Sequence, residues 1–182
     1  MSFLGSFTIG SAIDLHVIFR AFKEVEKVRN DVSLLIIGGG GPLEGKYRAL
    51  IQELGLKNII ITGRVPQSEV PRLLSAVDIG LIYMEDNIFN KCRMSLKLLE
   101  YLSMEINVAG HIAGEAKGIF DRYCFLVEPS IDSFSKTILE VLENKAGKET
   151  ASRFIKEYYD WGVIKPYLAR VFWEVIHENS VC

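Results

Sequence analysis

The 182-residue chain has little cysteine, no long apolar run and no excess of charge of one sign. Its three cysteines and three histidines lie far apart without a ligand spacing, which argues against disulfides and against a metal site. No stretch approaches the roughly 18 consecutive apolar residues of a membrane-spanning helix, and the N-terminus lacks the features of a signal peptide. Because 21 Lys and Arg face 23 Asp and Glu, the charge gives no general attraction to nucleic acid. These absences predict a soluble intracellular protein without metal or nucleic acid.

Short apolar runs alternate with amphipathic segments along most of the chain. The runs lack polar alternation, which favours strands of a parallel sheet buried on both faces. They cover residues 3–7, 32–37, 58–62, 77–83, 106–109 and 123–127. Helical periodicity covers residues 11–28, 42–54, 68–76, 95–104 and 131–144, with Ser68 and Ser95 as expected N-terminal caps. The alternation predicts an α/β fold, a doubly wound parallel sheet with helices on both faces.

The end of the chain shows helical periodicity alone. After Gly147 the pattern predicts helices, the last of them with Pro166 in its first turn. Trp161 and Trp173 are expected to pack in the core or at a contact with another domain. At roughly 150 residues per domain, the length predicts one domain over residues 1–182, with a helical tail over about 147–182.

Four glycines at residues 38–41 follow one of the apolar runs. Glycine there permits a sharp turn and lets a phosphate approach backbone N–H groups, although a tight turn without a ligand favours the same residues. The dinucleotide fingerprint GxGxxG fails, because Leu43 or Glu44 stands at its third glycine. Residues 40–46 fit the GxxxxGK of a P-loop, but Tyr47 replaces the Ser or Thr that would hold magnesium. A P-loop-like nucleotide-binding protein is therefore a weaker alternative.

A charged cluster surrounds the expected start of one helix. Ser95 is placed to cap that helix, and Lys97 in its first turn opposes the helix dipole, which an anionic ligand would explain. Lys91, Arg93 and Lys97 together suit a diphosphate. Glu100 lies among leucines, where a carboxylate needs a partner such as a sugar hydroxyl. A surface ion pair between Lys97 and Glu100 is the purely structural alternative.

In order and spacing, these segments resemble the C-terminal, donor-binding half of a GT-B glycosyltransferase of retaining family four, the glycosyl transferases group 1. The resemblance covers roughly residues 3–177 and implies a Rossmann-like domain. Its landmarks are residues 35–42, 61–65, 73–78, 95–103, 125–129 and 159–161. The Ser-x-Lys-x-x-Glu-Tyr form resembles the subgroup that builds cell-surface polysaccharides and lipid-linked glycans.

The resemblance implies roles in binding a UDP- or GDP-linked sugar, with no cofactor and no metal. Glu100 would bind the ribose hydroxyls, and Val65 would lie beside the base. Backbone amides of residues 95–97 would hold the diphosphate and the donor sugar, while the catalytic residues stay unassigned. The predicted donor-site residues are Gly39, Gly41, Arg64, Val65, Lys91, Arg93, Ser95, Leu96, Lys97 and Glu100.

The sequence departs from the family pattern at several positions. Cys92 stands where the first glutamate of the E-x7-E motif is usual, and Ser6 and Ser11 stand where the family has a diphosphate-binding Arg and Lys. Glu105 and Asn107 replace the usual glycine and proline after the helix. Either the neighbouring cations supply the missing charge, which we favour, or the domain is a non-catalytic interaction module that has lost nucleotide binding.

The length limits what the chain can do alone. A full GT-B enzyme has two such domains with the active site between them, and this chain has the length of one. The resemblance therefore implies a glycosyltransferase that is inactive without an N-terminal acceptor domain, either missing from this chain or carried by a partner subunit. An apolar face left by that half would favour self-association. The resemblance implies a cytoplasmic location and leaves open a peripheral association of the full enzyme with the inner face of the membrane.

Overall fold

The computed structural model describes residues 1–8, 12–144 and 150–178 of the chain. Within this part, six parallel strands form one sheet in the order β3-β2-β1-β4-β5-β6. The strands are β1 (Ser2–Gly5), β2 (Leu34–Gly38), β3 (Ile59–Ile61), β4 (Ile79–Tyr83), β5 (Asn107–His111) and β6 (Cys124–Leu126). The predicted α/β fold with a doubly wound parallel sheet is confirmed.

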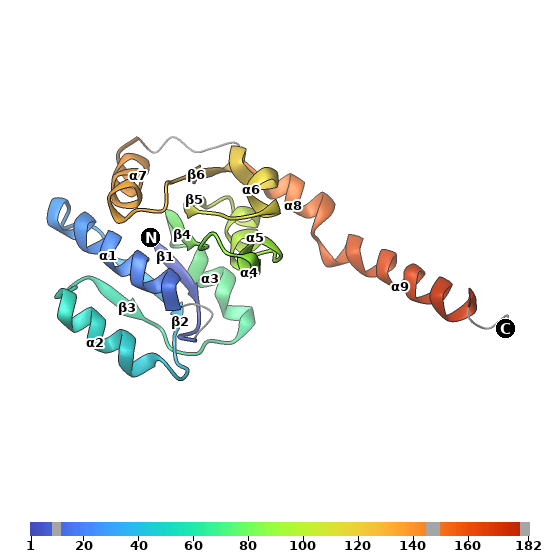
Figure 1. Ribbon diagram of the computed structural model, residues 1–182, viewed down its shortest axis with the longest axis horizontal. Helices are drawn as coiled ribbons and strands as arrows, with labels where there is room; N and C mark the ends of the chain where they lie inside the picture. Colours follow the sequence, from blue (N-terminus) through green and yellow to red (C-terminus); the bar gives the residue numbers. More distant parts are fainter. Residues whose placement is uncertain (9–11, 145–149, 179–182) are drawn as a thin grey trace.

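Helices cover both faces of the sheet (Figure 1). Helices α1 (Ala12–Val28), α2 (Glu44–Leu54) and α7 (Ile131–Asn144) pack on one face. Helices α3 (Val70–Leu74), α5 (Leu96–Ser103), α6 (Glu115–Phe120) and α8 (Ser152–Tyr158) pack on the other. The short helix α4 (Ile88–Lys91) follows β4, and the 3-10 turns η2 (Gln67–Glu69) and η3 (Asp121–Tyr123) precede α3 and β6. Helix α9 (Trp161–Glu178) extends away from this body (Figure 1).

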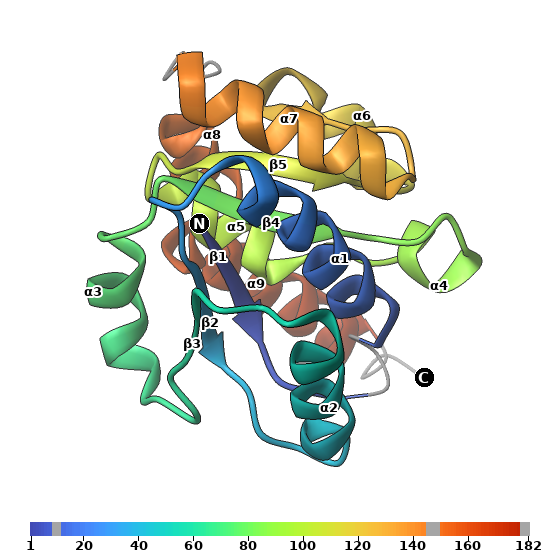
Figure 2. The same ribbon diagram turned by 90° about the vertical axis from the view of Figure 1, so that its left-hand side faces the viewer.

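The strand order changes direction between β1 and β4. The chain runs from β1 outward to β2 and β3, then returns to β4 on the other side of β1 and continues outward to β5 and β6. Open parallel sheets bind ligands outside the carboxyl ends of their strands at such a switch point. At this switch point β1 ends at Gly5 and β4 ends at Tyr83. Figure 2 shows α4 beyond the end of β4.

Apolar side chains on both faces explain the absence of polar alternation in the strands. Successive residues of a strand point to opposite faces, and in β2 Ile36 packs in the core beneath α1, α2 and α7, whereas Ile37 packs in the core beneath α5 and α6. Both cores also receive residues of the central strands: Phe3 of β1 packs in the first core and Ile82 of β4 packs in the second. A strand buried on both faces therefore reads as a continuous apolar run.

Tyr101 fixes α5 against the sheet. Its ring lies over Gly80 of β4, where a Cβ would come within 2.5 Å of the ring carbons. The hydroxyl of Tyr101 is buried and donates a hydrogen bond to the carbonyl oxygen of Ser2 at 3.2 Å. This contact joins β1, β4 and α5 at the switch point, so it also sets where the start of α5 lies.

The predicted helix over residues 68–76 is wrong in its start and its continuity. The structure has the 3-10 turn η2 followed by α3, and no side-chain hydrogen bond from Ser68 caps either element. Pro71 is the physical reason for the discontinuity, because a proline has no N–H to donate to the carbonyl of Gln67, so the α-helix does not extend back over the turn. The turn is closed by the N–H of Glu69, which donates to the carbonyl of Pro66 at 3.0 Å.

The helical tail also differs from the prediction. Helix α9 begins at Trp161, so Pro166 lies inside the helix and not in its first turn. Asp160 explains the earlier start, because its carboxylate accepts a hydrogen bond from the N–H of Gly162 at 2.6 Å. Trp161 and Trp173 do not pack in the core, since they are 73% and 67% exposed.

Some predictions fall on residues without a description. Residues 147–149 and 179–182 of the predicted tail, and Ser11 at the start of the first predicted helix, lie outside the described residues. None of the helices in the described ranges is both long and apolar enough to span a bilayer.

Candidate functional site

A pocket of about 770 Å³ opens at the carboxyl ends of β1 and β2, beside the start of α5. Its walls come from the end of β1, the glycine loop after β2, the loop after β3 and the first turn of α5. This is the edge at which a sheet of this topology binds ligands. The lining residues are Leu4, Gly5, Ser6, Ile37, Gly38, Gly39, Arg64, Val65, Gln67, Val70, Arg93, Met94, Ser95, Leu96, Lys97 and Glu100.

The pocket brings together eight of the ten residues predicted from the sequence. They are Gly39, Arg64, Val65, Arg93, Ser95, Leu96, Lys97 and Glu100. Gly41 and Lys91 are not among the lining residues. Gly41 lies against the loop after β1, where a Cβ would come within 2.7 Å of the carbonyl oxygen of Phe7. Lys91 forms an exposed ion pair with Asp86 at 2.8 Å. The structure thus gives these two residues contacts away from the pocket.

The glycine loop is built for close backbone contact with the segment after β1. The N–H of Gly39 donates to the carbonyl of Gly5 at 2.9 Å, and the N–H of Phe7 donates to the carbonyl of Gly40 at 2.8 Å. A Cβ on Gly38 would lie 2.4 Å from the carbonyl oxygen of Gly5. Tight packing therefore accounts for part of the glycine content. Lys46, the lysine of the P-loop alternative, lies in α2 and does not line the pocket.

Helix α5 begins at the pocket, with backbone donors for which the described part of the chain supplies no acceptor. Ser95 is the N-cap residue, as predicted, but its side chain forms no capping hydrogen bond. Its carbonyl accepts the N–H groups of Leu98 and Leu99, at 3.1 and 3.3 Å. The first N–H groups of a helix have no carbonyl partner within it, and here they belong to Leu96 and Lys97, which line the pocket. These donors and the helix dipole favour an anion.

Lys97 in the pocket wall interacts electrostatically with Asp14 of α1. The ammonium of Lys97 lies 4.0 Å from the centre of the Phe3 ring, a cation–π contact. Burial lowers the pKa of Lys97 to about 8, and the Asp14 carboxylate opposes that decrease. Asp14, buried in α1, has its own pKa raised to about 6 by loss of hydration. Asp14 is not among the residues predicted from the sequence; its signal there is a carboxylate among the apolar residues of the first half of α1.

Glu100 is held by a partner that the sequence did not reveal. Its Oε1 accepts a hydrogen bond from Nε2 of Gln67 at 3.1 Å. Loss of hydration raises the pKa of Glu100, while the hydrogen bond and the charge of Lys97 oppose the rise. Among the described ion pairs none joins Lys97 to Glu100, so the structural alternative of a surface pair is not what the structure contains. A carboxylate accepts several hydrogen bonds, which leaves capacity for ligand hydroxyls.

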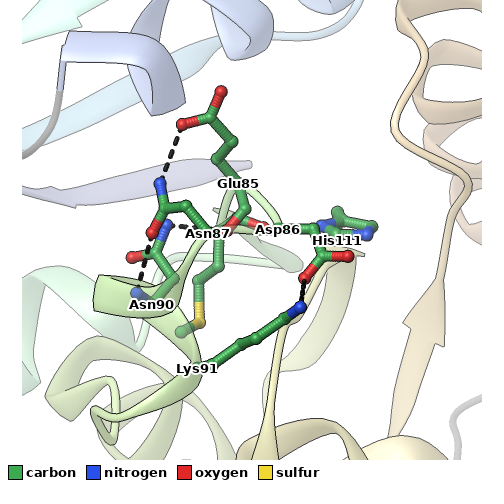
Figure 3. A network of polar contacts seen from close by, with 7 residues as sticks. Glu85, Asp86, Asn87, Asn90, Lys91 and His111 are labelled. Carbon is green, nitrogen blue, oxygen red and sulfur yellow. Dashed lines mark hydrogen bonds and ion pairs between the residues drawn. The ribbon is translucent and has the colours of Figure 1, made fainter.

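The loop between β4 and α5 is ordered by amide side chains (Figure 3). Asn87 caps α4, since its Oδ1 accepts the N–H of Asn90 at 2.9 Å, and its Nδ2 donates to the Glu85 carboxylate at 2.8 Å. The side chain of Asn90 reaches back to the carbonyl of Glu85 and forward to Arg93, which donates from Nε at 2.8 Å. Arg93 is therefore the cation of this loop that reaches the pocket wall.

Other features of the described residues offer less. A second cavity of about 480 Å³ lies at the amino ends of β4 and β5, with Met1, Asp78 and Asn107 in its wall. That edge is opposite to the one where such sheets bind ligands. Within the described ranges, no three His, Cys, Asp or Glu side chains are grouped as metal ligands would be.

Comparison with a family model decides the classification. The model described as glycosyl transferases group 1 matches residues 9–161, which is most of the chain and includes 13 of the 16 residues that line the pocket. The chain belongs to the glycosyl transferases group 1 family. No curated protein sequence matches it.

Solved structures show the same fold. The C-terminal domain of a glycosyl transferase group 1 family protein, LpcC, from Francisella tularensis is 18% identical, with a TM-score of 0.69 over 87% of this chain and 85% of that one. Sucrose-phosphate synthase from Thermosynechococcus elongatus is 15% identical, with a TM-score of 0.76 over 97% of this chain and 46% of that one. Anabaena HepE, in complex with UDP and glucose, is 14% identical, with a TM-score of 0.76 over 95% and 47%.

The group 1 chain is thus the size of one domain of these proteins. It spans 85% of the isolated LpcC domain but less than half of sucrose-phosphate synthase and of HepE. The expected resemblance to the C-terminal half of a GT-B glycosyltransferase is confirmed.

Proposed function

We propose that this chain is the donor-binding half of a glycosyltransferase and holds a UDP- or GDP-linked sugar in the pocket at the start of α5. The main support is that one pocket contains groups of opposite charge. Glu100 faces the same space as Arg93, Lys97 and the N–H groups at the start of α5. A ribose offers hydroxyl donors to a carboxylate, and a diphosphate offers charge to cations and amides. HepE, which has this fold, binds UDP and glucose.

The pocket residues have separate roles in binding the donor and in stabilising its leaving group. As the bond between sugar and diphosphate breaks, negative charge develops on the nucleoside diphosphate. Arg93, Lys97 and the amides at the start of α5 would stabilise that charge. Glu100 would fix the nucleotide through its ribose, and Val65 would border the base. Groups that bind the acceptor belong to an N-terminal domain or a partner subunit, and the acceptor would be a polysaccharide or a lipid-linked glycan.

A non-catalytic module of the same fold is the second candidate. The observation that favours it is Ser6 in the pocket wall, where the resembled family has a cation. The two candidates differ in nucleotide binding, because a pocket that has lost its ligand gains no stability from it.

Thermal unfolding with UDP, GDP, ADP and ATP tests the proposal on the chain as it exists. A ligand at 100 times its Kd stabilises by about 2.7 kcal/mol, and for a chain of this size that raises the Tm by roughly 5–10 °C. We expect UDP or GDP to do so, and Glu100→Ala to remove the increase. The matched control is Glu140→Ala, the same change at an exposed position of α7.

An analogue isolates the role of the carboxylate. If Glu100 binds the ribose, the intact chain prefers UDP over 2′,3′-dideoxy-UDP and Glu100→Ala binds both equally. No Tm change with any nucleotide at millimolar concentration would refute donor binding by this chain and support the non-catalytic module. An increase with ATP that depends on Lys46 and not on Glu100 would support the P-loop alternative.

A further inference from the structure

We infer that Asn90 is a positioning residue, whose side-chain carbonyl holds the guanidinium of Arg93 at the wall of the donor pocket so that its terminal nitrogens can meet the diphosphate. The inference rests on the proposed function, because it names the diphosphate as the partner of Arg93. It concerns a residue outside the pocket, since Asn90 is not among the lining residues.

Asn90 is held in place by contacts other than the one to Arg93. It is 5% exposed, and its backbone N–H donates to Oδ1 of Asn87 at 2.9 Å. Its Nδ2 donates to the backbone carbonyl of Glu85 at 2.9 Å (Figure 3). A carbonyl oxygen accepts hydrogen bonds and cannot donate them, so this contact sets which end of the amide is the nitrogen. The oxygen of Asn90 therefore points to Arg93, and the position of the amide is set by the backbone directly after β4.

Arg93 is held from two directions. Its Nε donates to Oδ1 of Asn90 at 2.8 Å, and its guanidinium carbon lies 5.1 Å from the centre of the Phe89 ring. These contacts use the inner N–H and one face of the guanidinium. Its terminal nitrogens, which carry four further N–H donors, take part in none of the ion pairs found among the described residues.

An amide suits this position better than a carboxylate would. A neutral acceptor orients the guanidinium without neutralising it, so the positive charge stays available for an anionic ligand. The neighbouring pair shows the contrast, because Lys91 is neutralised by Asp86 at 2.8 Å. The loop therefore contains two cations: Lys91, which is paired with a carboxylate, and Arg93, which is oriented by an amide.

Calorimetric binding of UDP and of uridine tests the inference. We expect Asn90→Ala to weaken UDP binding about 5- to 10-fold and to leave uridine binding within twofold, because uridine lacks the phosphates. The double variant with Arg93→Ala should bind UDP no more weakly than Arg93→Ala alone, as expected when one residue acts through the other. Asn90→Asp should also weaken UDP binding, here because it neutralises Arg93. Lys136→Ala, at an exposed position of α7, serves as a control without effect.

The Nε–H of Arg93 provides a readout that needs no nucleotide. In ¹H–¹⁵N spectra of the intact chain we expect its signal to exchange slowly with water, to disappear in Asn90→Ala and to persist in Asn90→Asp. A signal that persists in Asn90→Ala, or a loss of uridine binding equal to that of UDP, would overturn the inference. If the intact chain binds UDP through Glu100 and Asn90→Ala binds it equally well, the inference fails while the proposed function stands. If the intact chain binds no nucleotide, the proposed function and the diphosphate role of Arg93 fail together, and the spectra still decide whether Asn90 holds it.

Discussion

Two ionisable side chains, Asp14 in α1 and Lys97 in the wall of the donor pocket, have pKa values far from their usual ones. Burial raises the pKa of Asp14 to about 6 and lowers that of Lys97 to about 8. Each residue favours the charged form of the other, so part of the cost of burying them is offset. Lys97 lies in the first turn of α5, at the pocket, and a site that binds an anion gains from keeping this lysine protonated at neutral pH.

We expect Asp14→Asn to stabilise the fold above pH 6. The folded state holds the Asp14 proton more tightly than the unfolded state does, so the stability that this group contributes is complete below pH 4 and lost as the pH rises through about 6. At about 1.4 kcal/mol per pKa unit, the gain at pH 8 is at most about 3 kcal/mol. Denaturant unfolding at pH 4 and pH 8 measures it.

The control for this prediction is Asp132→Asn in α7. Asp132 forms an exposed ion pair with Lys136, and an exposed pair is worth at most about 1 kcal/mol. Its loss should lower stability slightly at pH 8. Equal free energies of unfolding for Asp14→Asn and the native chain at pH 8 would contradict the assigned cause of the shift.

Glu105 shows how a departure from the family pattern is accommodated. It lies in the left-handed region at φ 58°, which favours glycine, the residue that the resembled family has there. Its carboxylate accepts hydrogen bonds from Ser152 at 2.7 Å and from Thr150 at 3.3 Å. These contacts offset the backbone strain and join the end of α5 to the start of α8.

At the scale of elements, the approach of α5 to the sheet depends on the missing side chain of Gly80. Tyr101 occupies the space that a Cβ would fill, and its hydroxyl is anchored to β1. Because α5 carries the donors of the pocket, any displacement of Tyr101 moves Lys97 and Glu100 as well.

We expect Gly80→Ala to destabilise the domain by about 1–3 kcal/mol, the cost of overpacking a core, and to weaken UDP binding. Gly118→Ala is the matched control, because it lies in α6 with no atom within 4 Å of the added methyl group. In a helix interior that change stabilises by up to about 1 kcal/mol. Chemical denaturation measures both, and a Gly80→Ala chain as stable as the native one would contradict the packing argument.

At the scale of the whole molecule, α9 extends away from the body of the domain and leaves many of its large apolar side chains exposed. Leu168, Phe172 and Ile176 are exposed along one side of it, while Arg170 and Glu174 form an ion pair at 3.7 Å. Trp161, Tyr167 and Trp173 are exposed as well, and at about 150–250 Å² for each aromatic side chain the helix exposes apolar area on the order of 1,000 Å², counted over all of its sides. A standard interface buries about 800 Å² per partner, so the apolar side chains of α9 suit the centre of such an interface.

We expect the isolated chain to self-associate through α9. Analytical ultracentrifugation between about 1 and 100 µM should show dimers or larger species at the upper end. Phe172→Glu with Ile176→Glu should shift the chain to monomer without lowering its Tm, because neither side chain packs in the core. Arg170→Ala should leave association unchanged. A native chain that stays monomeric throughout this range would contradict the prediction.

The sequence by itself determined the fold and the composition of much of the pocket. Continuous apolar runs require strands buried on both faces, and the alternation with amphipathic segments leaves a doubly wound sheet as the arrangement. The segment around Ser95 and Glu100 carried its chemistry in local spacing, which a helix converts directly into position. Local signals failed where a single residue changes a helix boundary, as Pro71 and Asp160 do.

Tertiary structure decided which side chains meet. Gln67 and Glu100 are 33 residues apart, and Asp14 and Lys97 come from different helices, so their pairing depends on the strand order that brings β1 beside β4. The same holds for the two cations of the loop after β4. Lys91 forms an ion pair with Asp86, whereas Arg93 is held at the pocket by Asn90. Spacing along the chain contains no information about such contacts, because the energy of a contact depends on separation in space and the fold alone sets that separation.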